Sequence, residues 1–102
     1  MEWELHKKTL ADGKEVSFRP KGNSMKGKIE SGQKVTISPD ISEVEKGDIV
    51  FCKVNGHHYV HLVQAVKQKM GDKLYQIGNV KGHTNGTVGA HCVFGKVIKV
   101  ED

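Results

Sequence analysis

Short runs in which apolar and polar residues alternate recur along the whole chain. The clearest is Lys34–Ser38, where Val35 and Ile37 point to one side and the polar residues between and beside them to the other. A period of two is typical of a strand with one buried face, whereas a helix repeats every 3.6 residues. The pattern predicts strands over residues 15–19, 34–38, 48–54, 57–66, 73–77 and 92–100.

Turn dipeptides separate these runs. Asn55-Gly56 is the strongest hairpin signal, and Asp12-Gly13 and Gly71-Asp72 mark two further turns. The segment 1–14, which alternates weakly, is predicted to form an N-terminal strand and hairpin. Residues 78–89 are rich in Gly, Asn, Thr and His, and are predicted to form a loop. Short strands without a long helical period favour an all-β fold, a partly closed β-barrel of short antiparallel strands.

The expected core follows from the apolar positions of these strands. Its predicted members are Val35, Ile37, Ile49, Phe51, Val60, Leu62, Ile77, Val93 and Val97.

Composition narrows the class of protein. The 102 residues have the length of one domain, 1–102. The net charge of +4 comes from scattered lysines, a distribution that does not favour nucleic-acid binding.

Cys52 and Cys92 lie in apolar runs, so free thiols are expected in place of a disulfide. No apolar run is long enough for a signal core or a membrane span, which predicts a soluble, cytoplasmic protein. Six histidines without a Cys-x-x-Cys pair favour neither a metal site nor a cofactor.

A serine on a predicted tight turn is the main candidate for chemistry. It lies in Gly22-Asn23-Ser24-Met25, just before the strand 34–38. A serine hydroxyl becomes a nucleophile when a neighbouring base takes its proton. The alternative is a turn serine that caps a short helix.

This stretch resembles the serine box of the LexA-like and signal-peptidase-like serine peptidases. Four further blocks follow in the family's order, so that the resemblance covers residues 20–100. These blocks are Gly47-Asp48-Ile49-Val50, Tyr59-Val60-His61-Leu62-Val63, residues 75–85 and residues 93–100. The resemblance implies a peptidase-like β fold, with Ser24 as nucleophile and His61 as general base. A histidine at this place is the pattern of endoplasmic-reticulum and archaeal signal peptidases, whereas the bacterial enzymes use a lysine.

The chain departs from that pattern at the group that orients the base. The resemblance implies an aspartate within a Lys-Gly-Asp segment, but here Lys81-Gly82 is followed by His83. Asn85 and Asp48 are the alternative orienting groups. Backbone N–H groups at Ser24 and its neighbours, Asn23 and Met25, are the candidates for binding the oxyanion.

Two hypotheses for function follow. The first is a soluble serine endopeptidase that uses a Ser24–His61 dyad on a peptide or protein substrate, or on itself. The second is a catalytically weak or inactive binding or assembly module with the peptidase fold, of the kind that a phage or mobile element encodes. A homodimer formed through the C-terminal strand is a further expectation.

Overall fold

One antiparallel sheet makes up most of the protein. The computed structural model describes residues 3–20, 28–30 and 32–102. The elements in chain order are α1 (Trp3–Ala11), β1 (Val16–Phe18), β2 (Lys34–Ser38), β3 (Ile49–Val54), β4 (His57–Lys69), β5 (Asp72–Gly78), β6 (Thr84–Gly89), the 3-10 turn η1 (Ala90–Cys92) and β7 (Val93–Glu101).

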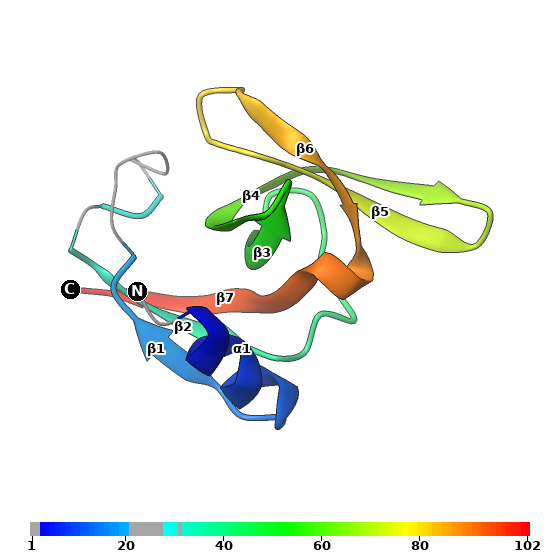
Figure 1. Cartoon of the computed structure of the whole chain (residues 1–102). Coiled ribbons are helices and arrows are strands. Elements are labelled where there is room, and N and C mark those ends of the chain that lie inside the picture. Colours follow the sequence, from blue (N-terminus) through cyan, green and yellow to red (C-terminus); the bar gives the residue numbers. More distant parts are fainter. Residues whose placement is uncertain (1–2, 21–27, 31) are drawn as a thin grey trace.

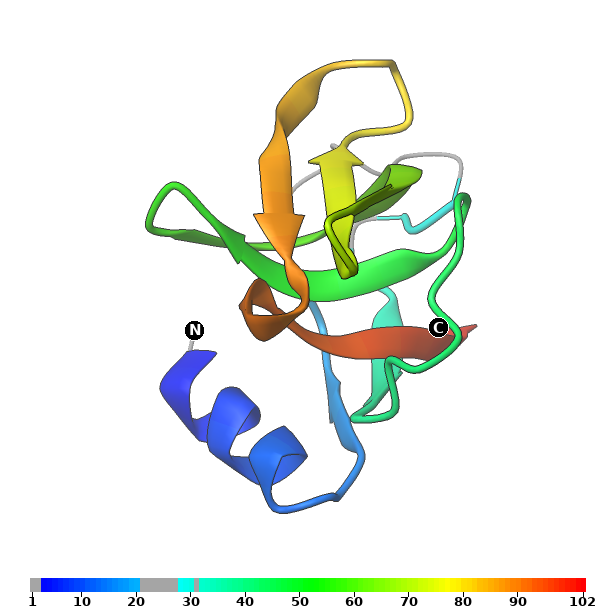
Figure 2. The same cartoon turned by 90° about the vertical axis from the view of Figure 1, so that its right-hand side faces the viewer.

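The seven strands lie in the order β1-β2-β7-β3-β4-β5-β6, and each neighbouring pair is antiparallel (Figures 1 and 2). The all-β class is therefore confirmed. Among the described residues β1 and β6 remain the outer strands, so the sheet does not close into a barrel. Instead it curls, and β6 passes across β3 (Figure 2).

The hairpin that joins β3 to β4 forms at the predicted place. Asn55 and Gly56 have φ values of 50° and 83°, both positive, as the central residues of a type I′ turn require. The turn aligns Val54 with His57 and carries the register as far as Ile49 opposite Leu62. β2 also has the predicted bounds, and β4 continues to Lys69 in a hairpin that projects from the body (Figure 1).

The N-terminal segment is a helix, so the strand and hairpin predicted for residues 1–14 are wrong where the structure describes them. Leu10 is buried and Trp3 packs on Phe18 and Phe51, with ring centroids 5.7 and 5.2 Å apart. The spacing from Trp3 to Leu10 is two helical turns, which places both on one face.

The predicted turn at Asp12-Gly13 is the C-terminal cap of α1. Gly13 has a φ of 81°, its N–H donates to Leu10 O at 2.9 Å, and Lys14 N–H donates to Thr9 O at 3.2 Å. These two bonds form a Schellman motif, which a glycine in the left-handed region completes. The same dipeptide thus ends a helix where it was expected to join two strands.

β6 lies within the segment predicted to be a loop. It has one aliphatic side chain, Val88, so its composition carries little strand signal. Its place is fixed by pairing with β5 and by close approach to β3, because a Cβ at Gly86 would lie 2.8 Å from Val54 Cγ1.

Two apolar clusters occupy opposite faces of the sheet, and β3 contributes to both. Phe51 belongs to the first cluster, whereas Val50, Cys52 and Val54 belong to the second. Six predicted core residues are buried: Val35, Ile37, Phe51, Val60, Ile77 and Val93. Three others are half-buried against the first cluster: Ile49, Leu62 and Val97. Ile77 and Val93 of the second cluster were predicted, but its β3 members, Val50, Cys52 and Val54, were missed because alternation assigns only one buried face to a strand.

None of the described helical segments combines the length and apolar character that crossing a bilayer requires.

Phe51 has no exposed surface and touches the rings of Trp3, Phe18 and Phe94. Phe51→Ala should therefore lower the free energy of unfolding by about 3–5 kcal/mol in denaturant titrations. The matched control is Leu5→Ala on the outer face of α1, where Leu5 is 59% exposed and the change should be below about 0.5 kcal/mol. Equal effects of the two substitutions would contradict this account of the core.

Candidate functional site

His61 is a buried titratable side chain in the middle of the sheet. It lies on β4 opposite Val50 of β3 and is 7% exposed. The ring of Tyr59, on the same face of β4, lies 4.6 Å away, centroid to centroid. A polar side chain at such a position is normally hydrogen-bonded, because burial without a partner is costly.

One hydrogen-bond partner of this imidazole comes from β6. His61 Nδ1 lies 2.7 Å from Asn85 Oδ1. Asn85 is directed there by a β-bulge, since β5 pairs Ile77 with Gly86 and Gly78 with Thr84, which leaves Asn85 without a partner in the ladder. Bulges of this kind redirect a side chain at a strand edge.

The bond has a consequence for the protonation of the ring. An amide oxygen is an acceptor, so Nδ1 must be the atom that carries the hydrogen and donates. In the neutral ring Nε2 then keeps its lone pair. His61 is thus held in the tautomer that presents Nε2 as a base.

The environment favours the neutral imidazole. Burial lowers the pKa of His61 below its ordinary value of 6.5; the hydrogen bond to Asn85 raises the pKa and offsets part of that effect, and the charge of a protonated His83 lowers it further. His61 is therefore unprotonated at neutral pH, as a general base must be.

The other predicted site residues divide into three groups. Ser24, Asn23 and Met25 lie outside the described residues. His83 is exposed, and its backbone is held by Asn79 of the preceding loop and by Gln64 of β4. Asp48 is engaged elsewhere, since its carboxylate accepts a bond from Glu45 N at 2.8 Å and lies 3.5 Å from Lys96 Nζ. Of the three candidates for orienting His61, the structure brings Asn85 into hydrogen-bond contact with it.

Sequence reasoning missed a polar side chain close to this pair. Gln64 lies on β4, three positions after His61, and hydrogen-bonds to the loop that leads to Asn85. Its signal was present in the sequence: strict alternation would place Gln64 on the face of Leu62, so a glutamine there interrupts an apolar face.

Beside Gln64 lies a pocket of about 360 Å³. Leu62, Val63 and Val80 supply its apolar wall, and the amides of Gln64, Gln76 and Asn79 line another part of it. No group of three His, Cys, Asp or Glu side chains suited to a metal ion occurs in residues 3–20, 28–30 and 32–102.

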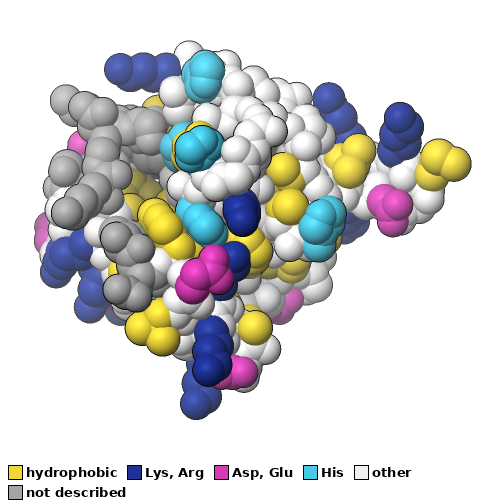
Figure 3. Space-filling model, viewed as in Figure 1, with side chains coloured by type: hydrophobic (Ala, Val, Ile, Leu, Met, Phe, Trp, Pro, Cys, Tyr) yellow, Lys and Arg dark blue, Asp and Glu magenta, His cyan; other side chains and the backbone are white. Residues whose placement is uncertain are grey.

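Lysine and arginine side chains lie at several separate places on the face shown in Figure 3, including the β4–β5 hairpin, and so do the histidines.

Comparison with known proteins decides the family. The model of the Peptidase S24-like family matches residues 2–74, well over half of the chain. The chain belongs to the Peptidase S24-like family. A search of curated proteins found no match.

The family match supports the resemblance to LexA-like and signal-peptidase-like peptidases. The matched residues of this S24-like chain include both Ser24 and His61, whereas Asn85 follows the matched segment. The family assignment therefore bears on the serine box and β4, and the geometry of β6 adds the partner of His61.

His61 should titrate below 6.5 and should carry its hydrogen on Nδ1 when neutral, because burial disfavours the cation and Asn85 Oδ1 can only accept. Long-range ¹H–¹⁵N correlation spectra across a pH titration report both properties. In Asn85→Ala the preference for the Nδ1–H form should weaken, because its acceptor is gone. A wild-type ring protonated on Nε2 would contradict the assigned geometry.

Proposed function

We propose that this S24-like chain is a serine endopeptidase in which Ser24 is the nucleophile and His61 is the general base. The observation that carries the proposal is the His61–Asn85 hydrogen bond inside a fold of this family, because it leaves Nε2 of a buried, neutral imidazole as the basic atom. A surface histidine without a fixed partner would have no defined tautomer.

The proposed reaction follows the general course of acyl transfer. Nε2 of His61 takes the proton of the Ser24 hydroxyl as Oγ attacks the carbonyl carbon of the substrate. The imidazolium then gives that proton to the leaving amine, which breaks the peptide bond and leaves an ester on Ser24. Water, activated by His61 in the same way, hydrolyses the ester. Backbone N–H groups around Ser24, including those of Asn23 and Met25, are the proposed donors to the oxyanion.

The neutral amide of Asn85 sets an upper limit to the rate. Asn85 can fix the ring, but it carries no charge to stabilise the imidazolium that forms during attack. A carboxylate at this place would add that stabilisation, and an amide does not. We therefore propose slow turnover, on a substrate that is presented at high local concentration or is cleaved once.

The substrate we propose is a peptide or another protein. Self-cleavage at Ala11-Asp12-Gly13 is disfavoured because that segment is the hydrogen-bonded cap of α1. A cytoplasmic location is part of the same proposal, supported by two free cysteines, which fit a reducing compartment.

The alternative is a binding or assembly module that keeps the fold and turns over weakly or not at all, as a phage or mobile element could encode. The amide at the position facing His61 favours it, since a carboxylate there would support faster catalysis. The retained Ser24 and the fixed tautomer of His61 favour the peptidase.

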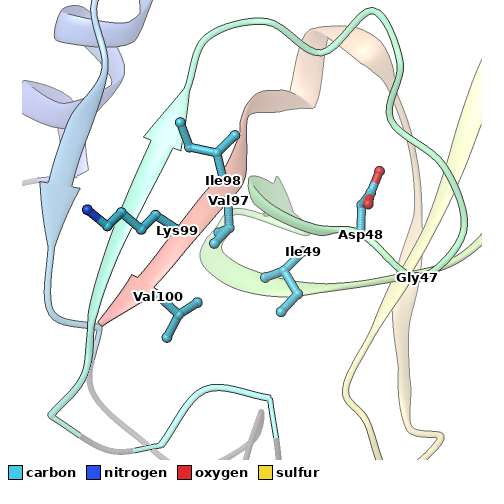
Figure 4. A pocket seen from close by; sticks show the side chains of 7 residues that line it. All are labelled: Gly47, Asp48, Ile49, Val97, Ile98, Lys99 and Val100. Carbon is cyan, nitrogen blue, oxygen red and sulfur yellow. The ribbon is translucent and has the colours of Figure 1, made fainter. Parts of the chain in front are cut away.

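A second copy of the chain is a proposed partner along β7. A bulge opposite Thr36 and Ile37 leaves Ile98 unpaired and 50% exposed. Beside it a pocket of about 240 Å³ lies between residues 97–100 of β7 and residues 47–49 before and within β3 (Figure 4). An exposed isoleucine next to a hollow that Ile49, Val97 and Val100 line together with Asp48 and Lys99 is the kind of surface that a symmetric dimer covers.

The dimer has a direct test. Sedimentation velocity of the wild type should show a concentration-dependent dimer, and Ile98→Lys should shift it to monomer because a charge cannot be buried unpaired. Leu5→Lys, on the outer face of α1, is the control that should leave the dimer intact. A wild type that stays monomeric at its highest soluble concentration would exclude this partner.

The peptidase has a test that needs no knowledge of the substrate. A fluorophosphonate probe should label Ser24, as located by mass spectrometry of the digested protein. Labelling should be absent in Ser24→Ala and at least about 100-fold slower in His61→Ala, because the serine proton then has no acceptor. Asn85→Asp should label about tenfold faster or more, since a carboxylate stabilises the imidazolium.

These outcomes separate the two functions. Labelling at Ser24 that is as fast in His61→Ala as in the wild type, or no labelling of the wild type and of Asn85→Asp, would leave the binding module as the function. Ser42, in the loop between β2 and β3, is the internal control for nonspecific reaction with the probe.

A further inference from the structure

A second β-bulge faces the one that carries Asn85. β4 pairs Val63 with Ile77 and Ala65 with Gln76, so Gln64 has no partner in the ladder. Both bulges therefore lie against the same short part of β5, one on each side of it. The bulge on β4 directs the Gln64 amide toward the loop between β5 and β6.

The Gln64 amide uses its full hydrogen-bonding capacity there. Its Oε1 accepts from Thr84 Oγ1 at 2.8 Å and from Gln76 Nε2 at 2.9 Å. Its Nε2 donates to His83 O at 3.0 Å and to Asn79 O at 3.4 Å. Two donors and two acceptor positions are all that a primary amide offers. One side chain thus ties β4 to β5, to the loop and to the first residue of β6.

The loop is shaped to receive this amide. Asn79 Oδ1 accepts from Lys81 N at 2.9 Å and from His83 N at 3.0 Å, and Asn79 N donates to His83 O at 2.9 Å. A Cβ on Gly78 would lie 2.1 Å from Gln64 Nε2 and 2.2 Å from His83 O. Only glycine leaves space for the Gln64 amide at this point.

The residues that Gln64 holds lead directly to Asn85. Its bonds go to His83 and Thr84, and the next residue along the chain makes the bond to His61. β4 therefore contacts the 83–85 segment at two places, through His61 and through Gln64.

We infer that Gln64 is a positioning residue, which fixes the 83–85 segment so that Asn85 Oδ1 stays against His61 Nδ1. The role in catalysis rests on the proposed peptidase function, whereas the role in orienting His61 does not. Chemistry restricts the position to a primary amide: a glutamate would bring negative charge to the carbonyls of Asn79 and His83, and an apolar side chain would satisfy none of the four partners.

The test replaces Gln64 with methionine, which has a similar length and no amide. In Gln64→Met the long-range ¹H–¹⁵N spectrum of His61 should lose its preference for Nδ1–H, as in Asn85→Ala. Fluorophosphonate labelling of Ser24 should slow by about tenfold, in the range that supporting residues of a site typically contribute. Gln68→Met, four positions further along β4 at an exposed position, is the matched control and should leave both readouts unchanged.

A double variant distinguishes positioning from a general loss of stability. Because Gln64 is inferred to act through Asn85, Gln64→Met combined with Asn85→Ala should be no worse than Asn85→Ala alone in labelling rate. A merely structural residue would add its effect to that of Asn85→Ala. Additive effects, or a wild-type His61 spectrum in Gln64→Met, would overturn the inference.

Thr84→Val keeps the inference testable if Gln64→Met does not fold. Thr84 is exposed, and the substitution removes only the hydroxyl that donates to Gln64 Oε1. The Nδ1–H preference of His61 should weaken in Thr84→Val, and an unchanged spectrum in a folded variant would count against the inference. The spectra test Gln64 even where the probe labels no variant, so failure of the peptidase and failure of this inference are separate results.

Discussion

The hydrogen bond between His61 and Asn85 joins two strands that are not neighbours in the sheet. β4 and β6 are separated by β5, so these side chains meet only because the sheet curls and a bulge turns Asn85 inward. The curl in turn requires the close approach of β6 to the β3–β4 hairpin, where Gly86 leaves room for Val54 and Asn55 Nδ2 donates to Asn85 O at 3.5 Å. The proposed chemistry therefore depends on the whole curved half of the sheet, from β3 to β6.

The burial of His61 has two opposing effects on its action as a base. Burial lowers the pKa of His61, so the ring is unprotonated at neutral pH and ready to accept a proton. A base with a lower pKa, however, takes that proton with less driving force. Asn85 fixes the direction of the ring without adding the charge that would offset this loss. Slow, well-directed proton transfer is what such a pair can provide.

Sequence patterns correctly predicted the elements whose own residues determine their backbone conformation. Lys34–Ser38 alternates strictly and is a strand with the predicted bounds, and Asn55-Gly56 supplies the positive φ values of its turn. α1 was mistaken for a strand because Trp3 and Leu5 are two positions apart, as in a strand, whereas Leu5 is exposed and the helix is anchored by Trp3 and Leu10. β6 was mistaken for a loop because tertiary pairing, and not its own composition, makes it a strand.

The candidate site shows the same division. The resemblance supplied His61, and Asn85 was one of several groups that could orient it. The choice among those groups depends on two bulges, at Gln64 and Asn85, which strict strand alternation does not predict. Their signals are visible only in retrospect, as a glutamine in an apolar run and an asparagine in a polar one.

One comparison can establish whether His61 is the base for Ser24. The rate of fluorophosphonate labelling at Ser24 should be measured across pH, together with the pKa of His61 from its imidazole resonances in the same protein. Labelling should rise with pH, because only the neutral ring accepts a proton, and its midpoint should coincide with the His61 pKa, below 6.5. A labelling rate that is flat across that range, or a midpoint well separated from the His61 titration, would contradict this role of His61.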